Sequence, residues 1–108
     1  GEPITPSGPR PLGAQRLDDE RIAVSFTDIE GDLIAYSGVD LIGFEVCGAD
    51  QASCRFVRAQ LQGARVLLDA RAQNSTRVRY CWGDAPICNL YDRSGLPAGP
   101  FEIAVSSE

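Results

Sequence analysis

The chain has 108 residues, enough for one domain with its own core, and its hydrophobic fraction of 44% is ordinary for a globular protein. A net charge of −5 gives no basic surface for nucleic acid or an anionic membrane, and no run of about twenty apolar residues could span a bilayer. The lack of histidine excludes a Ser-His-Asp triad and a His-ligated metal site within these residues. We therefore expect no catalytic centre, metal or cofactor in this chain, and no nucleic-acid or membrane partner.

The first thirteen residues differ in composition from the rest of the chain. Residues 1–13 combine proline and glycine with polar neighbours. Because proline fixes φ and removes a backbone donor, this segment is predicted to be an extended strap or linker. Residues 14–108 are then expected to form a single β domain.

After residue 20 the chain consists of short strand-like runs separated by turns. The best helical candidate, 61–72, contains Gly63 and the run Val66-Leu67-Leu68, which favour a strand. The pattern predicts an all-β fold, an antiparallel β-sandwich of jelly-roll-like type with about seven or eight short strands. The expected strands are 21–28, 33–36, 41–47, 54–60, 65–68, 76–82 and 101–105.

Alternation within these runs predicts which side chains share a face. Ile22, Val24 and Phe26 recur with a period of two, and the opposite face carries the polar residues Arg21, Ser25 and Thr27. The same rule places Ile42 on one side with Phe44 in the run 41–47. These apolar faces are the expected core.

Four cysteines, Cys47, Cys54, Cys81 and Cys88, form two pairs with six residues between the members of each. An even count in a short domain favours disulfides, here 47–54 and 81–88, and an oxidising location, secreted or periplasmic. Free buried thiols and a four-thiolate zinc site are the alternatives, the latter with spacers longer than structural zinc sites usually have.

The stretch from Val78 to Phe101, VRYCWGDAPICNLYDRSGLPAGPF, resembles the C-terminal segment of the sialate O-acetylesterase family, which typically reads VRYxWxDxPxCNLYNxxGLPxxPF. Pro6-Ser7-Gly8-Pro9 is similar to the SGP segment that follows the catalytic domain in that family. Gly43-Phe44-Glu45-Val46 and Gly48-Ala49-Asp50 look like its GFEIAGAD strand and turn. The resemblance covers nearly the whole chain and is most specific in the last third.

The resemblance implies the C-terminal accessory β domain of a carbohydrate esterase of the SGNH-hydrolase type. The family's nucleophilic Ser and catalytic His lie upstream of the SGP segment, so no catalytic residue is carried over to this chain. The implied partner is the SGNH-type catalytic domain of the parent enzyme, which would deacetylate sialic acids or plant polysaccharides such as xylan or xyloglucan. The implied role is non-catalytic: packing on that domain and shaping the substrate cleft.

Trp82, Asn89 and Tyr91 are the candidate substrate-binding or interdomain contacts. Aromatic rings stack on sugar faces, and polar neighbours such as Asp84, Asn89 and Asp92 could bind hydroxyl groups. Asn89 and Tyr91 are expected in a loop, where functional residues concentrate. Three interpretations stay open: internal packing, docking on the catalytic domain, and sugar contact by an autonomous carbohydrate-binding module.

Two further groups have simpler interpretations. Tyr80, two residues before Trp82 on the same expected strand, is predicted to be a core residue. The acidic triplet Asp18-Asp19-Glu20 could supply paired carboxylates for glycoside hydrolysis, but adjacent turn residues seldom point into one cleft. A solvated turn is the expected role of the triplet.

Overall fold

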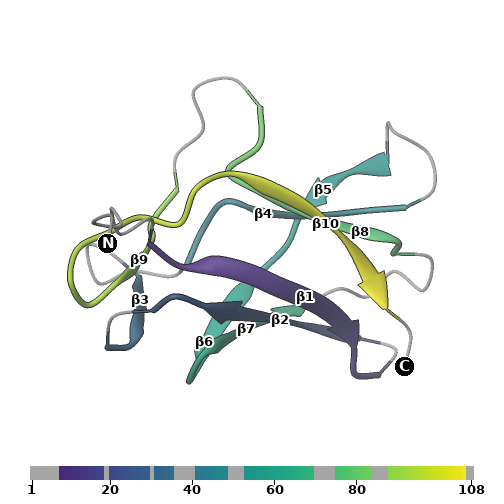
Figure 1. Ribbon diagram of the computed structural model, residues 1–108. Coiled ribbons are helices and arrows are strands. Elements are labelled where there is room, and N and C mark those ends of the chain that lie inside the picture. Colours follow the sequence, from purple (N-terminus) through teal and green to yellow (C-terminus); the bar gives the residue numbers. More distant parts are fainter. Residues whose placement is uncertain are drawn as a thin grey trace, which may run out of the picture.

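The computed structural model describes residues 8–18, 20–29, 31–35, 41–48, 53–69, 75–83 and 88–106. All the secondary-structure elements in these ranges are strands, which confirms the all-β prediction (Figure 1). No helix in the described ranges is long and apolar enough to cross a membrane. The strands are β1 (Arg10–Arg16), β2 (Arg21–Thr27), β3 (Leu33–Ala35), β4 (Phe44–Cys47), β5 (Arg55–Phe56), β6 (Ala59–Gln62), β7 (Arg65–Asp69), β8 (Arg77–Tyr80), β9 (Leu90–Asp92) and β10 (Phe101–Ser106).

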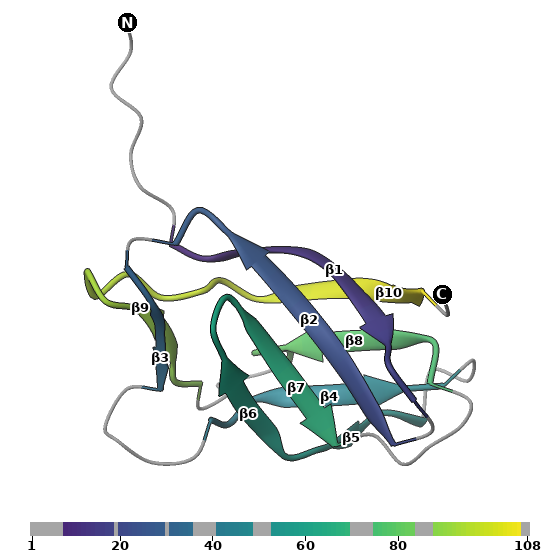
Figure 2. The ribbon, with the colours of Figure 1, turned by 90° about the horizontal axis from the view of Figure 1, so that it is seen from below.

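Most of these strands belong to one curled sheet. An eight-stranded sheet has the order β5-β4-β8-β10-β1-β2-β7-β6, and β3 and β9 form a separate two-stranded sheet. The large sheet bends so that the half β1-β2-β7-β6 lies against the half β10-β8-β4-β5, which gives a sandwich (Figures 1 and 2). Pairing is antiparallel except between β1 and β10, which run parallel, an exception that the sequence pattern did not predict.

The core lies between the two halves of the sheet. Ile22, Val24 and Phe26 of β2 are all buried, as their alternation predicts. The ring of Phe26 meets Phe101 of β10 edge-on at 5.8 Å, and the Tyr80 ring stacks on Phe101 at 5.6 Å. The prediction that Tyr80 belongs to the core is therefore confirmed.

The alternation rule fails just before β4. Ile42 is exposed and does not share a face with the buried Phe44. Gly43 lies between them with φ +106°, which is not a strand conformation, so the alternation of side chains is broken there. A β carbon at Gly43 would lie 3.2 Å from the Tyr80 ring and 3.3 Å from the Cys88 sulfur. Glycine at this position thus permits both the backbone turn and the close approach.

Two strands occupy segments that were expected to be irregular. β1 begins at Arg10, inside the expected strap, and Tyr91 lies in β9, where a loop was expected. Residues 1–7 lie outside the described ranges, so the expected linker out of another domain stays a prediction. The expected strands 41–47 and 54–60 pair with each other as the antiparallel β4 and β5, and most of the turn between them lies outside those ranges.

The strand directions define two ends of the sandwich. β1 and β10 start at the same end, where the registers also place the start of β4 and the end of β8; we call it the Gly8 end. β2 starts at the opposite end, beside the end of β7, and we call it the Arg21 end (Figure 2).

Candidate functional site

Trp82 follows β8 at the Gly8 end and is 41% exposed. Cys81, which precedes it, has φ +56°, so the strand alternation ends there and Trp82 leaves the face of Tyr80. The Arg79 guanidinium lies 5.0 Å from the Trp82 ring centroid, in cation–π geometry. Trp82 therefore lies over the outer face of the sheet, where a partner can reach it.

Arg79 belongs to a charged row across the outer face of β4, β8 and β10. Glu102 accepts hydrogen bonds from Arg79 Nε at 2.7 Å and from Arg77 Nη1 at 2.8 Å. The Arg79 guanidinium, and after it that of Arg77, holds the pKa of the Glu102 carboxyl below its usual range. Arg79 pairs in register with Glu102 of β10 on one side and with Glu45 of β4 on the other. The positive charges of the row are therefore balanced by glutamates of the same row.

Phe56 extends this row at the edge of the sheet. It pairs in register with Glu45 and is 71% exposed. The sequence predicted a longer strand over residues 54–60 and gave Phe56 no functional role, whereas the observed strand β5 has two residues and leaves Phe56 exposed. Exposed aromatics thus lie toward two sides of the outer face, with charged residues between them.

Asn89 has a different environment from that of Trp82. It is buried, and its side-chain oxygen Oδ1 accepts the Ile42 N–H at 2.8 Å. The carboxamide thereby ties the segment before β4 to the segment before β9. This side chain supports the backbone and does not present its oxygen to solvent.

Tyr91 and Asp92 belong to the small β3–β9 sheet. Tyr91 is half-buried and pairs with Ile34. Asp92 is fully buried, and its Oδ1 accepts the Ser94 N–H at 3.0 Å, the Ser94 hydroxyl at 2.7 Å and the Leu96 N–H at 3.2 Å. Asp92, considered above as a group for sugar hydroxyls, organises a turn instead; Asp84 lies outside the described ranges.

Tyr80 joins the large sheet to the small one. Its hydroxyl oxygen accepts the Leu90 N–H at 2.8 Å, at a site where both residues are almost fully buried. Burial raises the pKa of the Tyr80 phenol, so the hydroxyl stays neutral at ordinary pH. This bond fixes the start of β9 above the end of β8.

The two motifs that the resemblance places far apart in the sequence touch each other in space. Gly8 has φ +81°, and a β carbon there would clash with the Pro97 carbonyl oxygen. Pro9 is among the most completely buried residues. The SGP-like and GLP-like segments therefore pack together, and the chain enters the domain at a fixed point beside the β3–β9 sheet.

The structure contains both predicted disulfides, Cys47–Cys54 and Cys81–Cys88. They lie at opposite ends of the sandwich, since Cys47 ends β4 and Cys81 follows β8. The second anchors the Trp82 segment next to Gly43, whose carbonyl accepts the Cys81 N–H at 3.0 Å.

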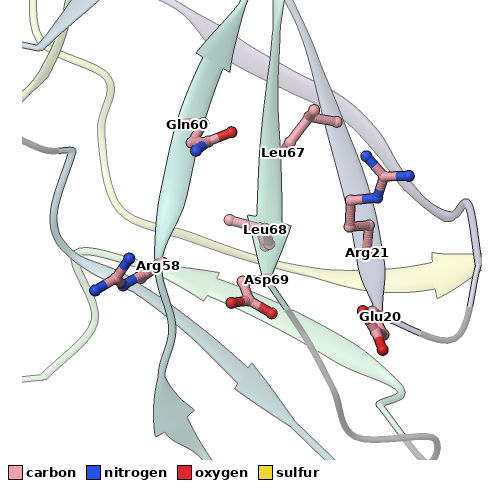
Figure 3. Close-up of a pocket in the computed structure, with 7 residues that line it drawn as sticks. All are labelled: Glu20, Arg21, Arg58, Gln60, Leu67, Leu68 and Asp69. Atoms are coloured by element: carbon pink, nitrogen blue, oxygen red, sulfur yellow. The ribbon is translucent and has the colours of Figure 1, made fainter.

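A pocket of about 380 Å³ opens at the Arg21 end, on the outer side of β2, β7 and β6 (Figure 3). None of the three predicted site residues belongs to it. Trp82 lies on another surface, Asn89 accepts a backbone N–H before β4, and Tyr91 lies half-buried in β9. The pocket lining was missed because its residues come from three sequence-distant segments. It is formed by Glu20, Arg21, Arg58, Gln60, Leu67, Leu68 and Asp69.

The acidic triplet has the structural role that the sequence favours. Asp18 Oδ1 accepts the Glu20 N–H at 2.9 Å, and its Oδ2 accepts hydrogen bonds from Arg21. The Glu20 N–H and then the Arg21 guanidinium hold the pKa of the Asp18 carboxyl below its usual range. Asp18 therefore shapes the turn into β2, while Asp19 lies outside the described ranges.

Comparison with known proteins relates this domain to part of an enzyme. No protein-family model and no curated protein matches the chain. Among solved structures, it is similar to a carbohydrate acetylesterase from Xanthomonas citri, with 31% sequence identity and a TM-score of 0.78. The match covers 89% of this chain and 22% of that protein. The chain thus corresponds to one domain-sized part of that enzyme.

Proposed function

We propose that this chain is a non-catalytic accessory domain of a carbohydrate O-acetylesterase. The observation that carries the proposal is the 31% identity over 89% of the chain to one part of such an enzyme. The chemistry must come from another part of the parent protein, because this chain has no histidine to activate a serine. We expect the pure 108-residue chain to hydrolyse no p-nitrophenyl acetate.

The partner in this proposal is the catalytic domain of the parent enzyme, of SGNH type according to the sequence resemblance. The Gly8 end supports docking there, because Gly8 and the buried Pro9 fix where the chain enters the domain. Trp82 is exposed at the same end, held by Arg79 and by the neighbouring disulfide. Preordered aromatic side chains lose little entropy on docking.

The substrate of the parent enzyme is proposed from the resemblance: acetylated sialic acids or acetylated plant polysaccharides such as xylan or xyloglucan. In this arrangement the accessory domain shapes one side of the substrate cleft. The two disulfides support a secreted or periplasmic location, since disulfides persist in oxidising compartments.

A second candidate is an autonomous carbohydrate-binding module. It is favoured by the exposed rings of Phe56 and Trp82, with the charged row between them. Aromatic rings of this kind can stack on sugars without any catalytic domain. The two candidates make different predictions for the isolated domain. An accessory domain acts only together with the catalytic domain, whereas a carbohydrate-binding module binds sugar on its own.

The test is co-purification of this chain with the catalytic domain of the parent enzyme, expressed separately, followed by an acetylesterase assay with and without this chain. We expect a complex that raises activity, and Trp82→Ala should weaken it more than the matched control Phe56→Ala. A catalytic domain that is fully active alone and forms no complex would refute docking. If Phe56→Ala abolishes the complex and Trp82→Ala does not, the docking surface is not at the Gly8 end.

A further inference from the structure

The pocket at the Arg21 end is built on two adjacent rows of the outer sheet surface. The registers place Arg21 opposite Asp69 and Leu67 opposite Gln60. Arg58 is next to Asp69 on the other side, because the Asp69 N–H donates to the Arg58 carbonyl at 2.9 Å. A polar row, Arg21-Asp69-Arg58, therefore lies beside a row that contains the apolar Leu67 (Figure 3).

One side of the pocket is preordered and the other is open. Asp18 Oδ2 holds the Arg21 guanidinium through Nη2 at 3.0 Å and Nε at 3.3 Å. In the part of the chain that the structure describes, the side chains of Arg58, Gln60 and Asp69 have no hydrogen-bonding partner. These three residues line a volume of about 380 Å³, within the usual range for small-ligand sites.

The charges at the pocket select against an anionic ligand. Arg21 is already paired with Asp18, and Arg58 faces the carboxylates of Glu20 and Asp69, so an anion finds no net positive charge. Guanidinium, carboxylate and carboxamide groups together provide both donors and acceptors, which is what hydroxyl groups require. Leu67 adds an apolar surface for the C–H face of a ring.

We propose that this pocket binds a neutral saccharide, one or two sugar units of a polysaccharide chain. The choice of a saccharide rests on the proposed function, and the charges at the pocket disfavour an anionic one. The pocket lies at the opposite end of the domain from Gly8 and Trp82, so a bound sugar and a docked catalytic domain occupy different surfaces. The domain thereby holds a polysaccharide while its partner removes acetyl groups.

The test is an NMR titration of the ¹⁵N-labelled 108-residue chain with xylotetraose, and in parallel with N-acetylneuraminic acid as the anionic comparison. We expect xylotetraose to shift the backbone amides of Gln60, Leu67 and Asp69 and the Nε–H signal of Arg21. Loss of one hydrogen bond from a charged donor should weaken binding about tenfold in Arg58→Ala. Arg55→Ala, which removes an exposed arginine from β5 outside the pocket, should leave the Kd unchanged.

Other outcomes overturn the proposal. These are no shifts with xylotetraose, shifts that cluster around Trp82 or Phe56, equal effects of the two arginine variants, or preference for the anionic sugar. Asp69→Asn provides a second variant of similar shape and should also weaken binding. Because the titration uses this chain alone, its result is independent of whether the catalytic domain docks, and the two proposals can fail separately.

Discussion

Removal of the Tyr80 hydroxyl tests how the two sheets are joined. Tyr80→Phe keeps the ring that packs 4.7 Å from Phe44 and 5.6 Å from Phe101, but removes the acceptor 2.8 Å from the Leu90 nitrogen. Leu90 is fully buried, so its N–H then lacks a partner. A buried unsatisfied donor costs about 1–3 kcal/mol, and at about 4–8 °C per kcal/mol for a domain of this size a central value of about 2 kcal/mol lowers Tm by about 8–16 °C.

The assay is thermal unfolding under conditions that keep the disulfides oxidised, with hydrogen exchange of the Leu90 amide as a second measurement. We expect a lower Tm and faster hydrogen exchange at the Leu90 amide. Amides in the centre of β2 should remain the slowest to exchange, because they open only when the whole domain unfolds. A Tm within about 2 °C of the parent chain, with Leu90 still protected, would refute the reasoning, because the N–H would then have found another partner at little cost.

Three other expectations follow from the same contacts. Gly8→Ala forces a β carbon toward the Pro97 carbonyl and strains a residue at φ +81°, so we expect a loss of about 1–3 kcal/mol in urea unfolding; an unchanged midpoint would show that this contact is not held. Glu102→Gln removes a carboxylate whose pKa is lowered mainly by Arg79, so its destabilisation should be present at neutral pH and vanish as pH falls through the folded-state pKa; a constant difference down to pH 2 would contradict this. Because the pKa of Tyr80 is raised by burial, its neutral form stabilises the fold below the unfolded value of 10.0, and the parent chain should lose stability relative to Tyr80→Phe as pH rises above it.

The local sequence pattern predicted a strand correctly where its apolar residues recur with a regular period. It failed where contacts with distant segments decide the backbone conformation. β2 agrees with its predicted residues because Ile22, Val24 and Phe26 alternate along it, although Ala23 between them is also buried. β9 has only three residues and depends on β3 for pairing and on Tyr80 for a hydrogen bond, neither of which is visible in the local sequence. β1 contains proline and glycine, and its pairing with β2 absorbs them by a register shift between Pro11 and Gly13.

The candidate site shows the same division. The exposure of Trp82 depends on the positive φ of Cys81, and the burial of Asn89 depends on the Ile42 N–H, 47 residues away. The pocket cannot be found from sequence, because Arg21, Arg58 and Asp69 come together only through the registers of β2, β7 and β6. Cysteine spacing, by contrast, predicted both disulfides, since short loops bring their own ends together.

The family-like motifs of this chain mark structure more than binding. Gly8 packs on Pro97, Tyr80 fixes β9, and Asn89 and Asp92 accept hydrogen bonds from backbone groups. These motif residues therefore build the Gly8 end. A match to such motifs therefore supports the fold and the way the domain is attached, but says little about which sugar is bound. The pocket residues lie outside every motif segment, at the Arg21 end. Under the proposal of a saccharide site, domains that share these motifs would differ in specificity through the side chains on the outer faces of β2, β7 and β6.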